Sequence, residues 1–266
     1  MPPTMEFTFV PALSFSGLLV GVLVGLTGVG GGSLMTPLLV MLFGYAPATA
    51  VGTDLLFAAA TKGGGTLVHH QHDNIDWRIV GWLALGSLPA TALTIYVLSL
   101  LGVDKHDTSH LITSALGIAL ILTAASIVFR QRLLAFAKQH VSLQRSAKRT
   151  ALTTIVFGAI LGAMVSITSV GAGALGVTVL VFLYPHLPMR QVVGSDIAHA
   201  VPLTLLAGVG HWWLGTVDFP LLFNLLIGSL PGIILGSYFT SRVPERGLRS
   251  LLATVLVVVG GKLIFA

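Results

Sequence analysis

Long apolar stretches recur along nearly the whole chain, and they constrain its fold more than any other feature. A helix needs roughly 20 apolar residues to cross the hydrocarbon core of a bilayer, which is about 30 Å thick. Hydropathy predicts such helices at residues 9–29, 48–69, 77–101, 109–129, 150–169, 192–213, 219–240 and 247–265. Only 9% of the residues are charged, against roughly 25% in soluble domains. The sequence therefore predicts an all-α protein that crosses a membrane many times.

Two shorter apolar runs lie between these spans, at residues 34–43 and 174–184. At about 1.5 Å per helical residue, neither run is long enough to cross the bilayer. We expect half-helices or re-entrant segments there, so the chain is predicted to contain eight to ten membrane segments.

The 14 basic residues gather in the breaks between the apolar spans, so their excess does not indicate a nucleic-acid-binding surface. Residues 130–149 hold six of them, and the cytoplasmic loops of membrane proteins are rich in lysine and arginine. With this linker inside the cell and alternate loops assigned accordingly, eleven basic residues fall inside and two, Lys105 and Lys262, fall outside. We predict a cytoplasmic (inner) membrane location, with the linker at 131–149 in the cytoplasm.

The chain contains an internal repeat in which polar residues coincide. Residues 21–47 align with 162–188, and after one inserted residue the alignment continues. The matched polar pairs are Thr27 with Thr168, Thr53 with Ser195, Asp54 with Asp196, His69 with His211, Asp76 with Asp218, and Ser87 with Ser229. Chance alignment of apolar sequence would not bring these residues into register.

Each half has an odd number of crossings, so the two repeats are expected to have opposite orientations in the membrane. We predict a first transmembrane repeat at 1–130 and a second at 150–266, each with four long helices and one short segment. Inverted-topology repeats are common among secondary transporters, and paired glycine-interrupted segments in them indicate a binding site near the midplane.

Glycine-rich breaks precede both short segments. The first contains Thr27, Gly28, Gly30, Gly31, Gly32 and Ser33, and the second contains Thr168, Ser169, Gly171 and Gly173. Consecutive glycines let the backbone approach a ligand, and the N-terminal end of a helix attracts negative charge. Two such ends, from opposite sides of the membrane, would form a substrate site for an anion without arginine. The second break is the poorer match, because Ser169, Ala172 and Ala174 replace glycine or serine.

Glycine and histidine in such patterns can also pack helices, bind nucleotides or bind metals. Gly17, Gly21 and Gly25 are spaced as in helix-packing motifs, and we interpret them as packing residues. The run at 30–32 has no lysine after it and no strand before it, so it matches neither a Walker A loop nor a dinucleotide fingerprint, and no cofactor is expected. The histidines at 69, 70 and 72 have no partner cluster elsewhere, so no metal site is expected either.

Three charged residues are predicted to lie inside membrane helices, where each charge costs about 2.5 to 3.5 kcal/mol. Lys62 has the uncharged Thr204 as its repeat mate, and it either faces an anionic substrate or snorkels to the interface. Asp54 and Asp196 either gate the path and take up a coupling proton or cap their helices. His199, three residues after Asp196, either shares that proton or is a plain buried histidine.

The sequence from Gly25 to Ser33, followed by Thr36-Pro37 and by residues 51–54, resembles the sulfite exporter TauE/SafE family of membrane permeases. The resemblance extends over about residues 13–265. It implies movement of sulfite, an organosulfonate or a related organic anion across the cytoplasmic membrane. It leaves the direction open, since the family is linked with both export and uptake.

The sequence-based hypothesis is a proton-coupled secondary transporter for a small anion. A passive anion channel would use the same site but ignore a pH gradient. A membrane-embedded enzyme is the third alternative, but the chain has no H-E-x-x-H, no G-x-S-x-G and no cysteine, so we expect no enzyme. The expected partners are the anionic substrate and membrane lipid, and the sequence leaves open whether the protein forms a homodimer.

Overall fold

The computed structural model describes residues 9–27, 32–102, 106–140, 146–239 and 245–265. Within these ranges the chain is all helical, without strands. The helices are α1 (Pro11–Thr27), α2 (Gly32–Leu42), α3 (Pro47–Gln71), α4 (Trp77–Leu101), α5 (His106–His140), α6 (Ala147–Thr168), α7 (Ala174–Leu183), α8 (Met189–Trp213), α9 (Phe219–Phe239) and α10 (Glu245–Ile264).

The predicted all-α membrane class is confirmed, and every apolar span expected from hydropathy corresponds to a helix. Within the described residues, five helices are long and apolar enough to cross a membrane, namely α4, α6 and α8 together with residues 107–129 of α5 and 219–236 of α9. The short runs form α2 and α7, with 11 and 10 residues. The number of segments that cross the membrane stays a prediction.

Helix α5 continues well beyond its apolar span. It runs to His140, whereas hydropathy ended the membrane helix at residue 129. Residues 131–140 of the basic linker are therefore a helical extension of α5, and α6 begins at Ala147. Hydropathy marks where apolar residues stop, but a helix can continue through Arg132 and Lys138 because their side chains tolerate helical backbone well.

The distribution of side chains is that of a protein surrounded by lipid. Leu152, Val156 and Ile160 lie four residues apart on one face of α6 and are all more than half exposed. Buried positions instead include Asp54, Asp196 and many hydroxyl side chains. Lipid offers no hydrogen bonds, so polar side chains lie inside the bundle, where neighbouring helices provide hydrogen-bond partners.

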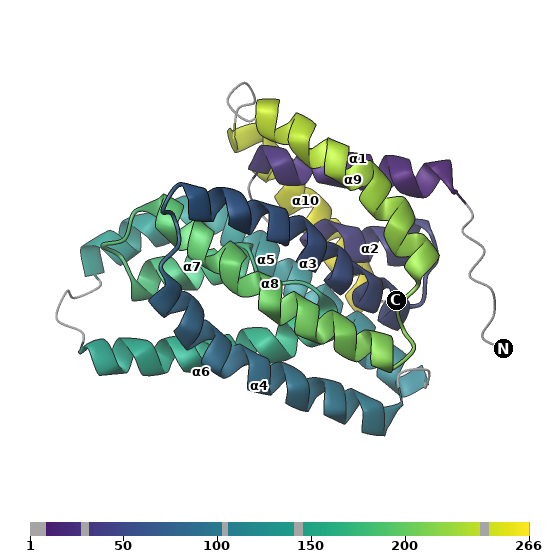
Figure 1. Ribbon diagram of the computed structural model, residues 1–266, viewed down its shortest axis with the longest axis horizontal. Coiled ribbons are helices and arrows are strands. Elements are labelled where there is room, and N and C mark those ends of the chain that lie inside the picture. The colour runs from purple at the N-terminus through teal and green to yellow at the C-terminus, as the bar shows by residue number, and fades with distance from the viewer. Residues whose placement is uncertain (1–8, 28–31, 103–105, 141–145, 240–244, 266) are drawn as a thin grey trace.

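The helices pack in pairs that combine the two halves of the chain. In Figure 1, α3 and α8 cross the middle of the molecule, α1 lies with α9 along one side, and α4 lies with α6 along the opposite side. Helices α5 and α10 form a further pair. Each half therefore buries its helices largely against the other half.

Glycines allow the close approach in the two outer pairs. A Cβ atom on Gly17 would overlap the backbone carbonyl of Leu225, and one on Gly21 would overlap that of Ser229. The packing role predicted for Gly17 and Gly21 is confirmed. Because the contact advances along both helices in the same direction, α1 and α9 are parallel. In the α4–α6 pair, Gly158 lies against Leu83 and Gly162 against Ser87, so those helices are parallel too.

We expect Gly86→Ala to destabilise the protein, because the added methyl group would overlap the carbonyl of Ile155 on α6. Overpacking of this kind costs about 1 to 3 kcal/mol. Gly81, on the same helix, is the matched control, since nothing lies within 4 Å of a Cβ atom there. Gly81→Ala should leave the melting temperature in detergent unchanged or raise it, and equal melting temperatures for the two variants would contradict the packing described.

Candidate substrate-binding site

Helices α3 and α8 lie antiparallel at the centre of the bundle. Gly52, near the start of α3, packs against His211 at the end of α8 and against Thr216 just after it. Gly194, near the start of α8, packs in the same way against His69 at the end of α3 and against Asn74 just after it. These contacts join positions that the sequence repeat makes equivalent.

Two hydrogen bonds repeat this relation. The backbone N–H of Asp218 donates to Oγ1 of Thr53 at 3.0 Å, and that of Asp76 donates to Oγ of Ser195 at 2.8 Å. The carboxylates of Asp76 and Asp218 also accept backbone N–H groups at the starts of α4 and α9. The hydroxyl of Thr53 on α3 therefore holds the start of α9, and the hydroxyl of Ser195 on α8 holds the start of α4.

Asp54 and Asp196 follow these hydroxyls directly and are fully buried. Each is the eighth residue of its helix, and the N-cap positions are Ala46 and Pro188, without side-chain caps. The alternative in which these aspartates cap their own helices is therefore wrong. Both carboxylates instead face the helix breaks of the bundle.

Asp54 meets residues from α2 and from the second break. Its Oδ2 atom accepts a hydrogen bond from Oγ1 of Thr36, on α2. The hydroxyl of Ser169 lies beside the same carboxylate. Within the described part of the chain, Oδ1 of Asp54 and Oγ of Ser169 make no hydrogen bond of normal geometry. These two buried polar atoms therefore lie beside each other without a well-formed hydrogen bond.

Asp196 lies at the N-terminal end of α7. Its carboxylate lies against the backbone N–H of Gly173, and its Oδ1 atom occupies the space that a Cβ atom on Gly176 would take. Oδ1 also lacks a hydrogen-bond partner among the described residues. The positive end of this short helix, expected to attract a substrate anion, therefore faces the protein's own carboxylate.

The break before α7 needs its glycines for conformational reasons. Gly171 has φ of 123° and Gly173 has φ of 133°, a region that side chains rarely adopt. Ser169 is left-handed as well, with φ of 58°. The Thr168 hydroxyl accepts the N–H of Val170 and donates to Met164, so it shapes the turn. The second break is thus a defined backbone structure despite its poorer match to the first.

Lys62 is a charged neighbour of both carboxylates. It is 7% exposed, and its ammonium donates to the carbonyl of Ala172 at 3.0 Å. Asp54 and Asp196 both act on its charge, yet no ion pair joins it to either one among the described residues. Thr204, its repeat mate, is buried and donates to the carbonyl of Ala200 within α8. Lys62 is therefore buried rather than snorkelling to the interface, and its one hydrogen bond given among the described residues goes to a backbone carbonyl.

His199 belongs to the same buried region but pairs differently from the expectation. Its Nε2 atom lies 2.8 Å from Oγ of Ser87 on α4, and its Nδ1 atom has no hydrogen-bond partner in the described ranges. No hydrogen bond joins it to Asp196 there. A direct carboxylate–imidazole pair is therefore not what this structure contains.

Part of the expected site lies outside the described residues. Gly28, Gly30 and Gly31 belong to this part, and the side chains of Thr27 and Ser33 do as well. Gly32 is the first residue of α2. The first glycine-rich end stays a prediction. Among the described residues, no three histidine or carboxylate side chains are grouped as metal ligands.

Three contributors were missed by the sequence analysis as site residues, namely Thr36, Ser87 and Gly176. Thr36 belongs to the Thr36-Pro37 pair of the family resemblance, and Ser87 belongs to the repeat alignment, so both were already marked in the sequence. Nothing in the sequence distinguished Gly176, since its role depends on how α7 lies against α8.

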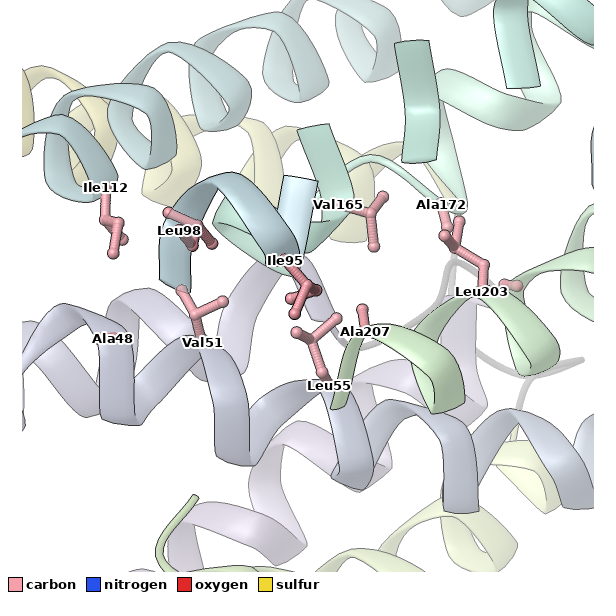
Figure 2. Close-up of a cluster of buried hydrophobic side chains, with 11 residues drawn as sticks. Ala48, Val51, Leu55, Ile95, Leu98, Ile112, Val165, Ala172, Leu203 and Ala207 are labelled. Atoms are coloured by element: carbon pink, nitrogen blue, oxygen red, sulfur yellow. The ribbon is translucent and has the colours of Figure 1, made fainter. Parts of the chain in front are cut away.

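Apolar side chains pack beside this polar cluster. Figure 2 shows Leu55 of α3, Ile95 of α4, Val165 of α6 and Leu203 of α8 packed together with Ala172, whose carbonyl binds Lys62. Few water molecules can enter such packing, and charges interact more strongly in a medium of low dielectric constant. An additional charge placed in this cluster would therefore interact strongly with the charges already there.

Residues 13–263 match the family described as sulfite exporter TauE/SafE. The chain belongs to this family. TauE/SafE relatives include "Probable membrane transporter protein YjnA" of Bacillus subtilis, 40% identical over 93% of this chain and 97% of the relative. Another is YdhB of the same organism, at 27% identity over 93% and 97% of the two chains.

A third TauE/SafE relative, from Haemophilus influenzae, is 26% identical over 95% of this chain and 97% of its own length. It too is named a membrane transporter protein. No solved structure matches the chain. Family and relatives indicate a membrane transporter rather than an enzyme.

We expect Gly176→Ala to destabilise the protein because the methyl group would displace the Asp196 carboxylate from the end of α7. The cause can be tested by a double-mutant cycle with Asp196→Ala, measured as unfolding in detergent. Removing the carboxylate should relieve the clash, so the two effects should be non-additive by about 0.5 to 3 kcal/mol. Additive effects would show that Gly176 is needed for another reason.

Proposed function

We propose that this protein is a proton-coupled secondary transporter that carries a small anion, such as sulfite or an organosulfonate, across the cytoplasmic membrane. The family and the names of its relatives support membrane transport. The identity of the anion, the coupling to protons and the choice of the cytoplasmic membrane go beyond the family and its relatives, and they are part of the proposal.

The observation that carries the proposal is the buried ammonium group of Lys62 beside unpartnered polar atoms. Asp54 Oδ1, Asp196 Oδ1 and Ser169 Oγ are buried without hydrogen bonds in the described part of the chain. Leaving such groups unpaired costs stability, about 1 to 3 kcal/mol each. Ionisable residues that proteins keep inside a membrane are commonly found on ligand or ion pathways.

The contacts of α3 and α8 support an inverted-repeat architecture. The antiparallel packing and the reciprocal Thr53–Asp218 and Ser195–Asp76 hydrogen bonds are what a two-fold axis in the membrane plane requires. We therefore propose repeats at 1–130 and 150–266, with α2 and α7 as the short segments beside the substrate.

We assign the residues as follows. Lys62 and the second glycine-rich break bind the anion together. Thr168 and Gly171 give that break its backbone conformation. The first break, at residues 27–33, supplies the opposite helix end. Asp54 and Asp196 take up the coupling proton, and His199 holds Ser87 beside them.

We expect Lys62→Met to abolish most anion flux. The assay is uptake of sulfite, methanesulfonate, sulfoacetate and acetate into proteoliposomes with an imposed pH gradient. A hydrogen bond to a charged group contributes about 1.5 to 3 kcal/mol, so the rate should fall about ten- to a hundredfold. Lys262→Met, which removes an exposed lysine at the end of α10, is the matched control and should transport normally.

Each failure of this assay has a distinct meaning. Wild-type flux in a folded Lys62→Met variant would remove Lys62 from the site. Absence of flux above protein-free liposomes for all four anions would contradict the proposed function. Flux that ignores the pH gradient would favour the passive channel.

The inverted orientation predicts that the two repeats begin on opposite sides of the membrane. The chain has no cysteine, so single cysteines can be labelled selectively in cells. Phe9→Cys, just before α1, should react with an impermeant maleimide from outside, whereas Ser146→Cys, just before α6, should react only after permeabilisation. Labelling of both positions from one side would show that the repeats are parallel.

A further inference from the structure

The charges buried at the proposed site do not balance. Lys62 contributes one positive charge, and Asp54 and Asp196 contribute one negative charge each. These are the carboxylate and ammonium groups that the described residues bury. If all three were ionised, the empty site would carry one net negative charge, which disfavours any anion.

The surrounding helices contribute hydroxyl and imidazole groups but no further buried charge among the described residues. Helix α2 provides Thr36, α4 provides Ser87, and the break before α7 provides Ser169. On α8, His199 is held by Ser87, and His211 is bonded to the carbonyl of Ser166 and to Thr216. Lys62 is the charged group that acts on both carboxylates.

Protons are the means by which this cluster can become neutral. In a low-dielectric interior, unbalanced charge is expensive, and a carboxylate escapes it by binding a proton. One proton, shared by the two carboxylates, makes the empty site neutral. One ionised carboxylate then remains, and it can accept one more proton.

The remaining capacity limits the charge of the ligand. A monoanion that enters together with one proton leaves the site neutral, with Lys62 paired to the anion and both carboxylates protonated. A dianion would need two protons, but only one carboxylate is left to accept them. We infer that the site selects monoanions and takes up one proton with each, so that the loaded site is neutral; this rests on the proposed function.

The geometry agrees with this state. A protonated carboxylic acid is a hydrogen-bond donor, and each aspartate has one unpartnered oxygen in the cluster where such a proton can reside. Ser169 Oγ and the remaining N–H groups of Lys62 are donors at the same place. A monoanion would therefore meet donors from α3, α8 and the second break.

Methanesulfonate and sulfoacetate test the inference, because both are sulfonates and they differ by one carboxylate. Proteoliposomes containing a pH dye and valinomycin report proton uptake and voltage dependence together. Methanesulfonate should enter with one proton each, at a rate that a potassium diffusion potential does not change. Sulfoacetate should enter at least about tenfold more slowly, as expected for a buried charge left unpaired.

The variant Asp54→Asn/Asp196→Asn isolates the role of the carboxyl groups. Asparagine imitates a protonated carboxyl group in shape, so this variant should bind methanesulfonate without taking up a proton. In a thermal-shift titration, the wild-type affinity should weaken about tenfold per pH unit at alkaline pH, which one linked proton requires. The affinity of the double variant should be independent of pH.

Asp76→Asn/Asp218→Asn is the matched control. These aspartates are also repeat mates, but they cap α4 and α9, where asparagine caps about equally well. This control should keep the wild-type pH dependence.

The outcomes separate this inference from the proposed function. Proton-coupled flux accompanied by net current, or equal rates for the two sulfonates, would overturn the inference and leave the proton-coupled transporter in place. Flux without proton uptake would overturn both the inference and the proton coupling, but not anion transport itself. Absence of flux for all four anions would remove both the inference and the proposed function.

Discussion

The antiparallel contact between α3 and α8 is the constraint on which the rest of the structure depends. It places the two buried aspartates in one cluster, because each lies one residue after a hydroxyl that binds the other half's next helix. Membrane helices gain little from hydrophobic burial against each other, so close backbone packing and such interhelical hydrogen bonds must hold them. The same contacts that hold the bundle together therefore position its charged groups.

The outer pairs α1–α9 and α4–α6 interlock the two halves of the sequence. Gly17 and Gly158 occupy corresponding places in these pairs, each against a backbone carbonyl of the other half. A motion that opened the site on one side would have to keep these contacts, since replacing them would leave voids in lipid-facing packing. The closely packed units of this bundle are accordingly helix pairs drawn from both halves, rather than the N-terminal and C-terminal halves themselves.

Much of the fold could be predicted from hydropathy, but the site depended on details that hydropathy does not carry. The predicted start of α8 at residue 192 came three residues late, since the polar residues Arg190 and Gln191 end the apolar run while the helix begins at Met189. That shift made a capping role for Asp196 plausible, although the residue lies two turns inside the helix. The contacts of Thr36 with Asp54 and of Gly176 with Asp196 could not be predicted for a different reason. They depend on how the short helices α2 and α7 lie against the long helices α3 and α8.

In the mechanism that we propose, the departures from the repeat are the reason why the cluster takes up protons. A lysine at position 204, mirroring Lys62, would balance the two aspartates without any proton and leave no reason for coupling. Thr204 is instead neutral, and its hydroxyl is bonded within α8. His199 likewise has the apolar Phe57 as its repeat mate. A nearly symmetric backbone thus carries an asymmetric set of charges. In the proposed mechanism, the absence of a second cation is what links anion binding to proton uptake.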